Sequence, residues 1–129
     1  MPNSNRPLSP FMIGPHYKPQ LTSMLSILHR ITGAALAVGL VLLTWFLFAV
    51  RSGEGAFLVF CDFRKSFIGQ AMLFGWLFSF VYHFLNGIRH LKWDMGYGFK
   101  LKSVYRTGYI VVIGSVIITV MIWTGIGVK

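Results

Sequence analysis

The sequence predicts an all-α membrane protein with three transmembrane helices. Three apolar runs long enough to cross a bilayer support this prediction: Ile31–Val50, roughly Ser66–Ile88 and Thr107–Val128. Hydrophobic residues make up 55% of the chain and charged residues only 12%, about half of the usual charged share. In a chain of 129 residues, three spans of about 20 residues each leave little room for a separate soluble domain.

The first 22 residues are expected to form an irregular N-terminal segment, because all five prolines of the chain lie there and proline interrupts a helix. We assign residues 1–22 to the cytoplasm and residues 23–129 to a three-helix membrane anchor. The spans are expected at about 23–50, 66–90 and 106–128. Inside lipid the backbone polar groups must be satisfied within each segment, so each run is predicted to be helical. Thr22, Ser23 and Ser26 are candidate capping residues for the first helix.

Basic residues are unevenly divided between the two sides of the predicted anchor. Eight belong to the N-terminal segment and the second connection: Arg6, Lys18, Arg30, Arg89, Lys92, Lys100, Lys102 and Arg106. Four belong to the first connection and the C-terminus: Arg51, Arg64, Lys65 and Lys129. Cytoplasmic loops carry an excess of Lys and Arg, so we expect a cytoplasmic N-terminus and an external C-terminus. Topology and membrane lipid headgroups explain the net charge of +9, and no nucleic-acid partner is expected.

The beginning of the chain shows no cleavable targeting segment. The residues MPNSNRPLSP have neither an apolar core before a cleavage site nor an Arg-rich amphipathic pattern, which favours a bacterial inner (cytoplasmic) membrane protein. Cys61 is the only cysteine, so a disulfide framework or a multi-cysteine metal site within the chain is excluded.

A candidate haem ligand lies toward the end of the second run. His83 lies inside the apolar run, where an ionisable residue is costly and needs a partner. Neutral imidazole can ligate haem iron, and Gly87, on the same helical face, would leave room for a porphyrin. His90 lies two turns beyond His83, about 10 Å nearer the basic end, on the expected side of the haem propionates. The alternative is that His83 only hydrogen-bonds a neighbouring helix.

A second polar cluster opens the first span. Ser26 lies one turn before Arg30, and His29 lies next to Arg30. The fixed charge of Arg30 suits a carboxylate such as a haem propionate, and the Ser26 hydroxyl can donate to the carbonyl of a small polar headgroup. The alternative is structural, because serines cap helices and an arginine at a membrane edge extends to the headgroups.

The number of buried histidines bears on the assembly. Ligation of a haem by two histidines needs two buried side chains, and only His83 is expected well inside a span, with His29 and His90 at the boundary. A second ligand would therefore come from another chain, and the three helices would form part of a multi-subunit helical bundle. The third span has no Lys, Arg, His, Asp or Glu between Arg106 and Lys129 and is expected to be a scaffold.

These motifs resemble the cytochrome b subunit of succinate dehydrogenase, the larger of the two membrane anchors of respiratory complex II. The resemblance covers nearly the whole chain. It rests on R-P-L-S-P (Arg6–Pro10), S-x-x-S-I-L-H-R-I-T-G (Ser23–Gly33) and H-F-L-N-G-I-R-H-L-K-W-D-M-G (His83–Gly96). The chain departs from many relatives at Phe11, where they have a histidine, and the segment that follows is longer than the common form.

The resemblance implies that His83 is an axial ligand of haem b and that a smaller partner anchor supplies the other. It implies that Ser26 and Arg30 contribute to a ubiquinone pocket, and that His29 and Arg30 approach the haem propionates. Trp93 and Asp94 match a cytoplasmic turn near the iron–sulfur subunit, without an assigned role.

The implied reaction is succinate oxidation coupled to ubiquinone reduction. A flavoprotein subunit and the iron–sulfur subunit would carry the earlier steps, because this chain has no dinucleotide fingerprint and no cysteine cluster. The chain itself would be an anchor without catalytic residues for succinate oxidation. The alternatives are the anchor of a fumarate reductase that uses menaquinone, and a haem-free structural anchor.

Overall fold

The structure is a computed structural model that describes residues 20–127. Within this range the chain forms four helices and no strand. They are α1 (Leu21–Ser52), α2 (Glu54–Lys65), α3 (Phe67–Asp94) and α4 (Leu101–Gly125). Three of them, α1, α3 and α4, are long and apolar enough to cross a membrane, so the prediction of three spans is confirmed. Arg6, Phe11, Lys18 and Lys129, for which the sequence also makes predictions, lie outside the described residues.

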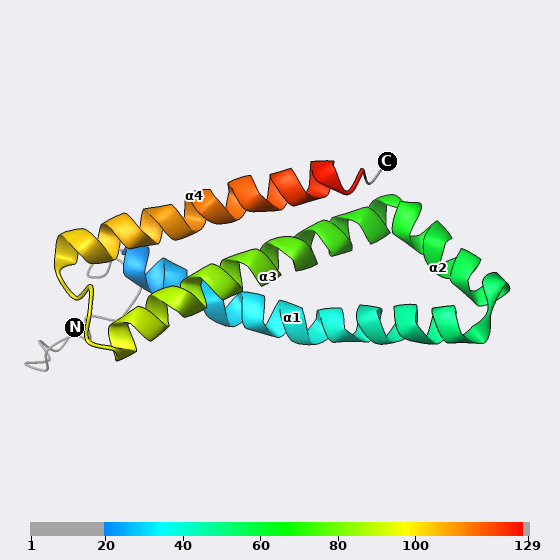
Figure 1. Ribbon diagram of the computed structural model, residues 1–129, viewed down its shortest axis with the longest axis horizontal. Coiled ribbons are helices and arrows are strands. Elements are labelled where there is room, and N and C mark those ends of the chain that lie inside the picture. Colours follow the sequence, from blue (N-terminus) through cyan, green and yellow to red (C-terminus); the bar gives the residue numbers. More distant parts are fainter. Residues whose placement is uncertain (1–19, 128–129) are drawn as a thin grey trace, which may run out of the picture.

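The three long helices run in alternating directions (Figure 1). The beginning of α1, the end of α3 and the beginning of α4 lie together at one end of the bundle. Gln20 and Gly127, the two ends of the described chain, therefore lie at opposite ends, as three crossings require. Both polar clusters singled out in the sequence belong to the end where α1 begins.

The prediction of capping residues for the first helix is wrong. α1 begins at Leu21, and its N-cap Gln20 makes no side-chain capping hydrogen bond. Thr22 and Ser23 therefore lie in the first turn and Ser26 lies in the second. The physical reason is that the last proline is Pro19, so nothing prevents the backbone from becoming helical directly after it.

The first connection contains a helix, α2, that was not predicted. Gly53 has a φ of 105°, a backbone conformation that favours glycine, and it separates α1 from α2. Ser66 then separates α2 from α3, because its extended backbone interrupts the helix and its Oγ accepts a hydrogen bond from the Gly69 N–H at 3.0 Å. Phe60 and Phe63 of α2 pack against Trp45 of α1, with ring centroids 5.1 and 4.9 Å from the indole. Aromatic packing thus holds α2 against the end of α1.

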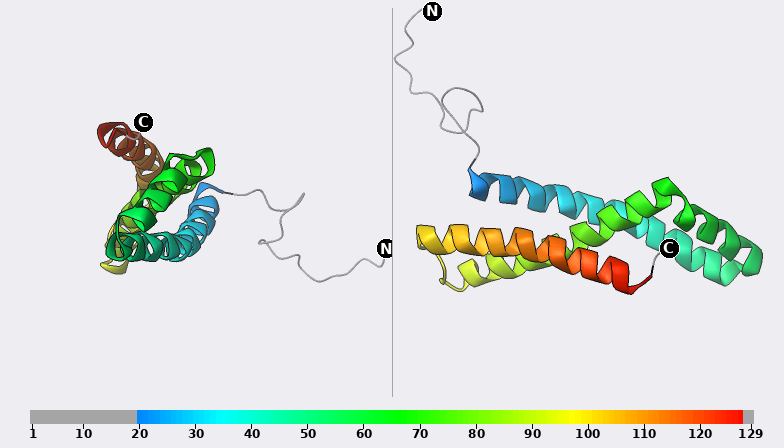
Figure 2. Two further views of the ribbon diagram at one scale, coloured as in Figure 1. Left: turned by 90° about the vertical axis from the view of Figure 1, so that its right-hand side faces the viewer. Right: turned by 90° about the horizontal axis from the view of Figure 1, so that it is seen from above.

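α3 packs against both α1 and α4, and the three helices share a small core. Figure 2 shows the crossing of α1 and α3 and the course of α4 along α3. Leu25, Tyr82 and Val111, one from each long helix, form this core. Tyr82 is fully buried, and its hydroxyl donates to the Leu25 carbonyl at 2.8 Å. Gly39 allows close packing further along, because a Cβ there would overlap the Trp76 indole.

The polarity of the described helices is reversed relative to a soluble bundle. Many large apolar side chains of α1, α3 and α4 are exposed. Polar side chains occupy the helix interfaces instead: Thr32, Ser79, Asn86, Arg89, Ser115 and Thr119 are all buried. In lipid, polar groups between helices bond one another while apolar groups face outward. This arrangement agrees with a membrane-embedded bundle.

Candidate functional site

Three imidazole rings form a continuous row where α1 meets α3. The His29 and His83 rings are stacked, with centroids 3.9 Å apart and planes 7° from parallel. The His90 ring lies on the far side of His29, at 5.4 Å between centroids. The structure thus brings together the three histidines that the sequence singled out, from two helices.

The position of His29 differs from the expected one. From the sequence, His29 is expected at the membrane boundary and His83 well inside a span. Because α1 begins at Leu21, His29 lies in the third turn of the helix, and the stacking contact puts its ring at nearly the same depth as His83. His29 is nevertheless unsuited to share a metal-bearing flat group with His83, because the stacked rings leave no space for such a group between them.

Hydrogen bonding determines which nitrogen of His83 is free. Nδ1 of His83 lies 3.1 Å from the backbone carbonyl of His29, which can only accept, so Nδ1 carries the proton. The Thr32 hydroxyl donates to the same carbonyl at 2.9 Å and lies 3.3 Å from His83 Nδ1. In the neutral ring the lone pair is then on Nε2. A bond from the second nitrogen to a carbonyl is the arrangement that orients histidine ligands of metals.

Two glycines shape the space around His83. A Cβ at Gly33 would lie 3.1 Å from Cε1 of His83, so the missing side chain on α1 makes room for the imidazole. A Cβ at Gly87 would meet nothing within 4 Å, so the α3 surface one turn beyond His83 is open. A flat group can therefore approach α3 there without displacing the helix.

Ser26 and Arg30 lie on α1, one turn apart on a common face next to His29. The Ser26 side chain is half-buried and the Arg30 side chain is exposed. In the described part of the chain, no hydrogen bond joins either residue to the row of imidazoles. The Arg30 guanidinium is accessible to a molecule outside the chain, and the Ser26 hydroxyl is partly accessible.

Arg89 is a buried residue whose role the sequence analysis missed. It was counted among the basic residues of the second connection, but it lies in α3 and is only 6% exposed. Its Nε donates to Thr107 Oγ1 at 3.1 Å, and one terminal nitrogen donates to the Val104 carbonyl at 3.0 Å. The guanidinium also lies over the Trp93 ring, 4.1 Å from the centroid. The spacing of Asn86, Arg89 and Trp93 on one helical face was the available signal.

The third span, expected to be a scaffold, holds a buried residue of α3. Thr107 and Val104 of α4 bind Arg89 of α3. Gly108 lies against this contact, since a Cβ there would lie 2.8 Å from Leu25 and 3.6 Å from Arg89. α4 therefore anchors a buried charge, although it contributes none of the predicted site residues.

The donor groups of the described residues restrict the metal chemistry of the site. Between residues 20 and 127, no group of three or more His, Cys, Asp or Glu side chains could hold a metal ion. Trp93 extends the row of rings, because its indole meets the His90 imidazole edge to face, with ring centroids 5.0 Å apart. No described contact joins Cys61 or Asp94 to the imidazoles. A single free Nε2 beside an open helix face suits an axial ligand of a flat macrocycle, which already supplies four ligands to its metal.

The chain is similar to known proteins over most of its length. The family described as "Succinate dehydrogenase/Fumarate reductase transmembrane subunit" matches residues 2–122. The "Succinate dehydrogenase cytochrome b556 subunit" of Rickettsia conorii is 41% identical over 120 residues, which cover 93% of this chain and 92% of that protein. Its counterpart in Paracoccus denitrificans is 38% identical over 117 residues, with 91% and 88% covered. The "Succinate dehydrogenase cytochrome b560 subunit" of Marchantia polymorpha is 40% identical over 115 residues, with 82% and 80% covered.

Proposed function

The chain belongs to the succinate dehydrogenase/fumarate reductase transmembrane subunit family, and we propose that it binds haem b through His83 and forms part of a ubiquinone-reduction site. It is a cytochrome b membrane-anchor subunit of succinate dehydrogenase. As such it is a multi-pass membrane protein and part of an enzyme complex, and it is not the catalytic subunit.

One observation carries the haem assignment. The bond from His83 Nδ1 to the His29 carbonyl fixes the tautomer and the direction of the ring, so Nε2 is the nitrogen presented to iron. When bound, haem b supplies a one-electron redox centre whose potential depends on its axial ligands and surroundings. The open surface at Gly87 supports a porphyrin edge beside α3. A histidine of the smaller partner anchor would supply the second ligand to the haem, since His29 is stacked on His83.

The cationic and imidazole groups near His83 suit the haem propionates. Arg30 is exposed at the beginning of α1 and provides a permanent positive charge for a carboxylate. His29 and His90 lie within one continuous row with His83, on the side toward the end of α3. We assign Arg30, His29 and His90 to the propionate side of the haem.

Ser26 and Arg30 form this chain's part of the quinone pocket. The half-buried Ser26 hydroxyl donates a hydrogen bond to a ubiquinone carbonyl. Arg30, one turn further along α1, stabilises the negative charge that develops on the ring as it is reduced. Because Arg30 also serves the haem propionates, it links the two sites through one side chain.

The end of the bundle where α1 begins indicates how the chain is oriented in the membrane and where it meets the other subunits. The beginning of α1, the end of α3 and the α3–α4 connection lie together (Figure 1), and eight of the twelve basic residues belong to this side in sequence. Excess Lys and Arg favours the cytoplasmic face of a bacterial inner membrane. On this face the anchor meets the iron–sulfur subunit, which receives electrons from the flavoprotein subunit.

A reduced-minus-oxidised absorption spectrum of the purified complex tests the haem assignment. We expect a b-type band in the wild-type complex and its loss in His83→Ala. Phe84→Ala, at the neighbouring exposed position, is the matched control and should retain the band. A b-type band that survives in a fully assembled His83→Ala complex would refute His83 as the ligand.

A further inference from the structure

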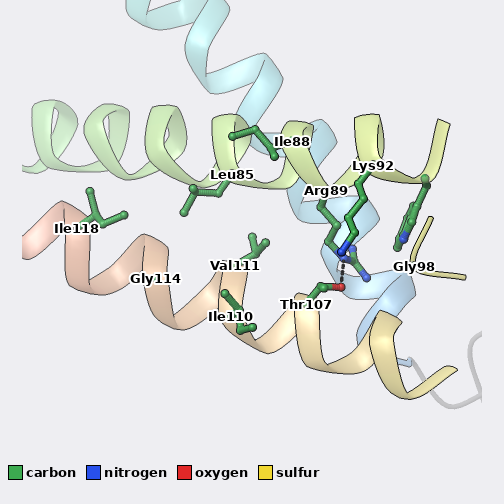
Figure 3. Close-up of a pocket in the computed structure, with 11 residues that line it drawn as sticks. Leu85, Ile88, Arg89, Lys92, Gly98, Thr107, Ile110, Val111, Gly114 and Ile118 are labelled. Carbon is green, nitrogen blue, oxygen red and sulfur yellow. Dashed lines mark hydrogen bonds between the residues drawn. The ribbon is translucent and has the colours of Figure 1, made fainter. Parts of the chain in front are cut away.

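A groove runs between α3 and α4 (Figure 3). Its volume is about 340 Å³. Along α3, the groove is lined by Leu85, Arg89 and Lys92. At 3.6 residues per turn, these positions lie on a different face of the helix from His83, Gly87 and His90. The groove therefore opens on the other side of α3 from His83, and among the described residues that line it only the Trp93 ring, at its charged end, also contacts His90 of the proposed haem site.

The groove has one charged end and one apolar end. Arg89 and Lys92 lie at the end near the α3–α4 connection, with Thr107 opposite them on α4 (Figure 3). The other walls are apolar or small, formed by Leu85, Ile88, Ile110, Val111, Gly114 and Ile118. This is the polarity of an amphiphile with an anionic head and a hydrocarbon tail.

Arg89 gives the charged end a buried positive charge with no carboxylate partner among the described residues, and its guanidinium is faced by the Trp93 ring at 4.1 Å. The side chain is 6% exposed, and its hydrogen bonds within residues 20–127 go to three neutral groups, on Asn86, Val104 and Thr107. The acidic residues of the chain are Glu54, Asp62 and Asp94, and none of these carboxylates is among those partners. A buried charge without a counter-ion is costly. Lys92, exposed at the same end, adds a second positive charge.

The dimensions of the groove match one leaflet of a bilayer. From Thr107 to Ile118 the wall formed by α4 extends about 16 Å at about 1.5 Å per residue. Half of the hydrocarbon core of a bilayer is about 15 Å thick. The apolar walls can thus contact one acyl chain from its carbonyl end to the bilayer midplane.

We propose that this groove is a specific binding site for an anionic phospholipid. Its headgroup phosphate is the counter-ion of Arg89 and Lys92, and one acyl chain lies along Ile110, Gly114 and Ile118. Basic pockets between transmembrane helices are recognised sites for such headgroups. A larger hollow of about 560 Å³ near the other end of the bundle has Arg64 in its wall, but Arg64 is only half-buried and has no such need of a counter-ion.

Two substitutions test the two ends of the site in the purified complex. Lys92→Gln removes a headgroup charge, and Lys102→Gln, at an exposed basic residue outside the groove, is its control. Gly114→Leu places a side chain in the acyl part of the groove, where a Cβ comes only within 3.7 Å of Leu85. Gly125→Leu, on the same helix with nothing within 4 Å of its Cβ, is the second control.

The measurement is native mass spectrometry of the delipidated complex after addition of equal amounts of phosphatidylglycerol and phosphatidylcholine. We expect the wild type and both controls to retain phosphatidylglycerol in preference to phosphatidylcholine. Lys92→Gln should lower this preference about fivefold, the effect of one basic residue near an anionic headgroup. Gly114→Leu should abolish retention of the tightly bound lipid.

Three outcomes would overturn the proposal. The first is equal retention of the two lipids by the wild type. The second is a preference for phosphatidylglycerol that neither Lys92→Gln nor Gly114→Leu changes. The third is efficient crosslinking of Ile118→Cys to a partner subunit, which would make the groove a protein interface. None of these outcomes depends on haem content, so failure here is distinguishable from failure of the haem assignment.

Discussion

The imidazole of His83 lies face to face with that of His29, with centroids 3.9 Å apart, while its Nδ1 bonds the backbone carbonyl of the same residue at 3.1 Å. One residue of α1 therefore determines both the plane and the tautomer of the proposed haem ligand on α3. Any change that moves α1 relative to α3 at this level should alter the haem site.

Gly33 offers a direct test of that dependence. Gly33→Val adds a branched side chain whose Cβ would lie 3.1 Å from Cε1 of His83, so the imidazole must move. We expect a lower haem content per complex and a shifted b-type band. Gly125→Val, where a Cβ meets nothing within 4 Å, should leave both unchanged. An unaltered spectrum and haem content in Gly33→Val would show that His83 does not depend on this contact.

Ser26 tests the quinone assignment. Ser26→Ala removes one hydrogen bond to a quinone carbonyl, which is worth about 0.5–1.5 kcal/mol. Ubiquinone reduction by the complex should fall by roughly twofold to tenfold, while succinate oxidation by an artificial acceptor should be spared. Ser52→Ala, at an exposed serine at the opposite end of α1, is the control. If Ser26→Ala leaves ubiquinone reduction intact, Ser26 does not belong to the pocket.

The Tyr82 hydroxyl tests the contact between α1 and α3. Tyr82→Phe removes the bond to the Leu25 carbonyl from a fully buried site. The loss should cost about 0.6–1.5 kcal/mol, since hydrogen bonds between membrane helices are modest. Tyr109→Phe, at a tyrosine that is 56% exposed, should cost nothing measurable. The measurement is the temperature at which each purified complex loses its helical circular dichroism, and equal midpoints for the two variants would contradict the prediction.

A substitution at Arg89 tests the hydrogen-bond geometry of the guanidinium separately from its charge. Arg89→Lys keeps the positive charge, but an ammonium cannot reproduce the guanidinium contacts with Thr107 and Val104 of α4. We expect a decrease in stability of about 1–3 kcal/mol, seen as a lower midpoint of thermal unfolding. Because the charge remains, the preference for an anionic phospholipid should persist. Lys102→Arg, at an exposed position, is the control for the Lys/Arg exchange. An unchanged midpoint in Arg89→Lys would show that the guanidinium contacts with α4 are dispensable.

The haem and quinone residues could be singled out from the sequence because each carries a local signal. His83 is an ionisable residue within an apolar run, and Ser26 and Arg30 recur at helical spacing at the beginning of a span. Their chemical roles remain predictions. Arg89 was misplaced because basic residues near the end of a span are usually exposed at the headgroups, and only the packing of α4 over α3 buries this one.

The sequence also does not show which glycines serve a contact between helices. Gly33, Gly39 and Gly87 all lie within predicted spans, yet Gly33 borders His83, Gly39 borders Trp76 and Gly87 borders open space. Which glycine serves a contact depends on how the helix faces meet. That relationship joins residues 50 positions apart for Gly33 and 37 for Gly39 and leaves no periodic pattern within either segment.

The number of membrane spans, their approximate limits and their helical state follow from composition along the chain. The transfer of a residue into lipid depends mainly on its own side chain, and lipid requires each segment to satisfy its own backbone. The stacking of His29 on His83, the burial of Arg89, the groove beside it and the helix α2 depend on packing between segments. A free Nε2 at His83 is therefore a property of the assembled helices, because the carbonyl that orients the ring belongs to another span.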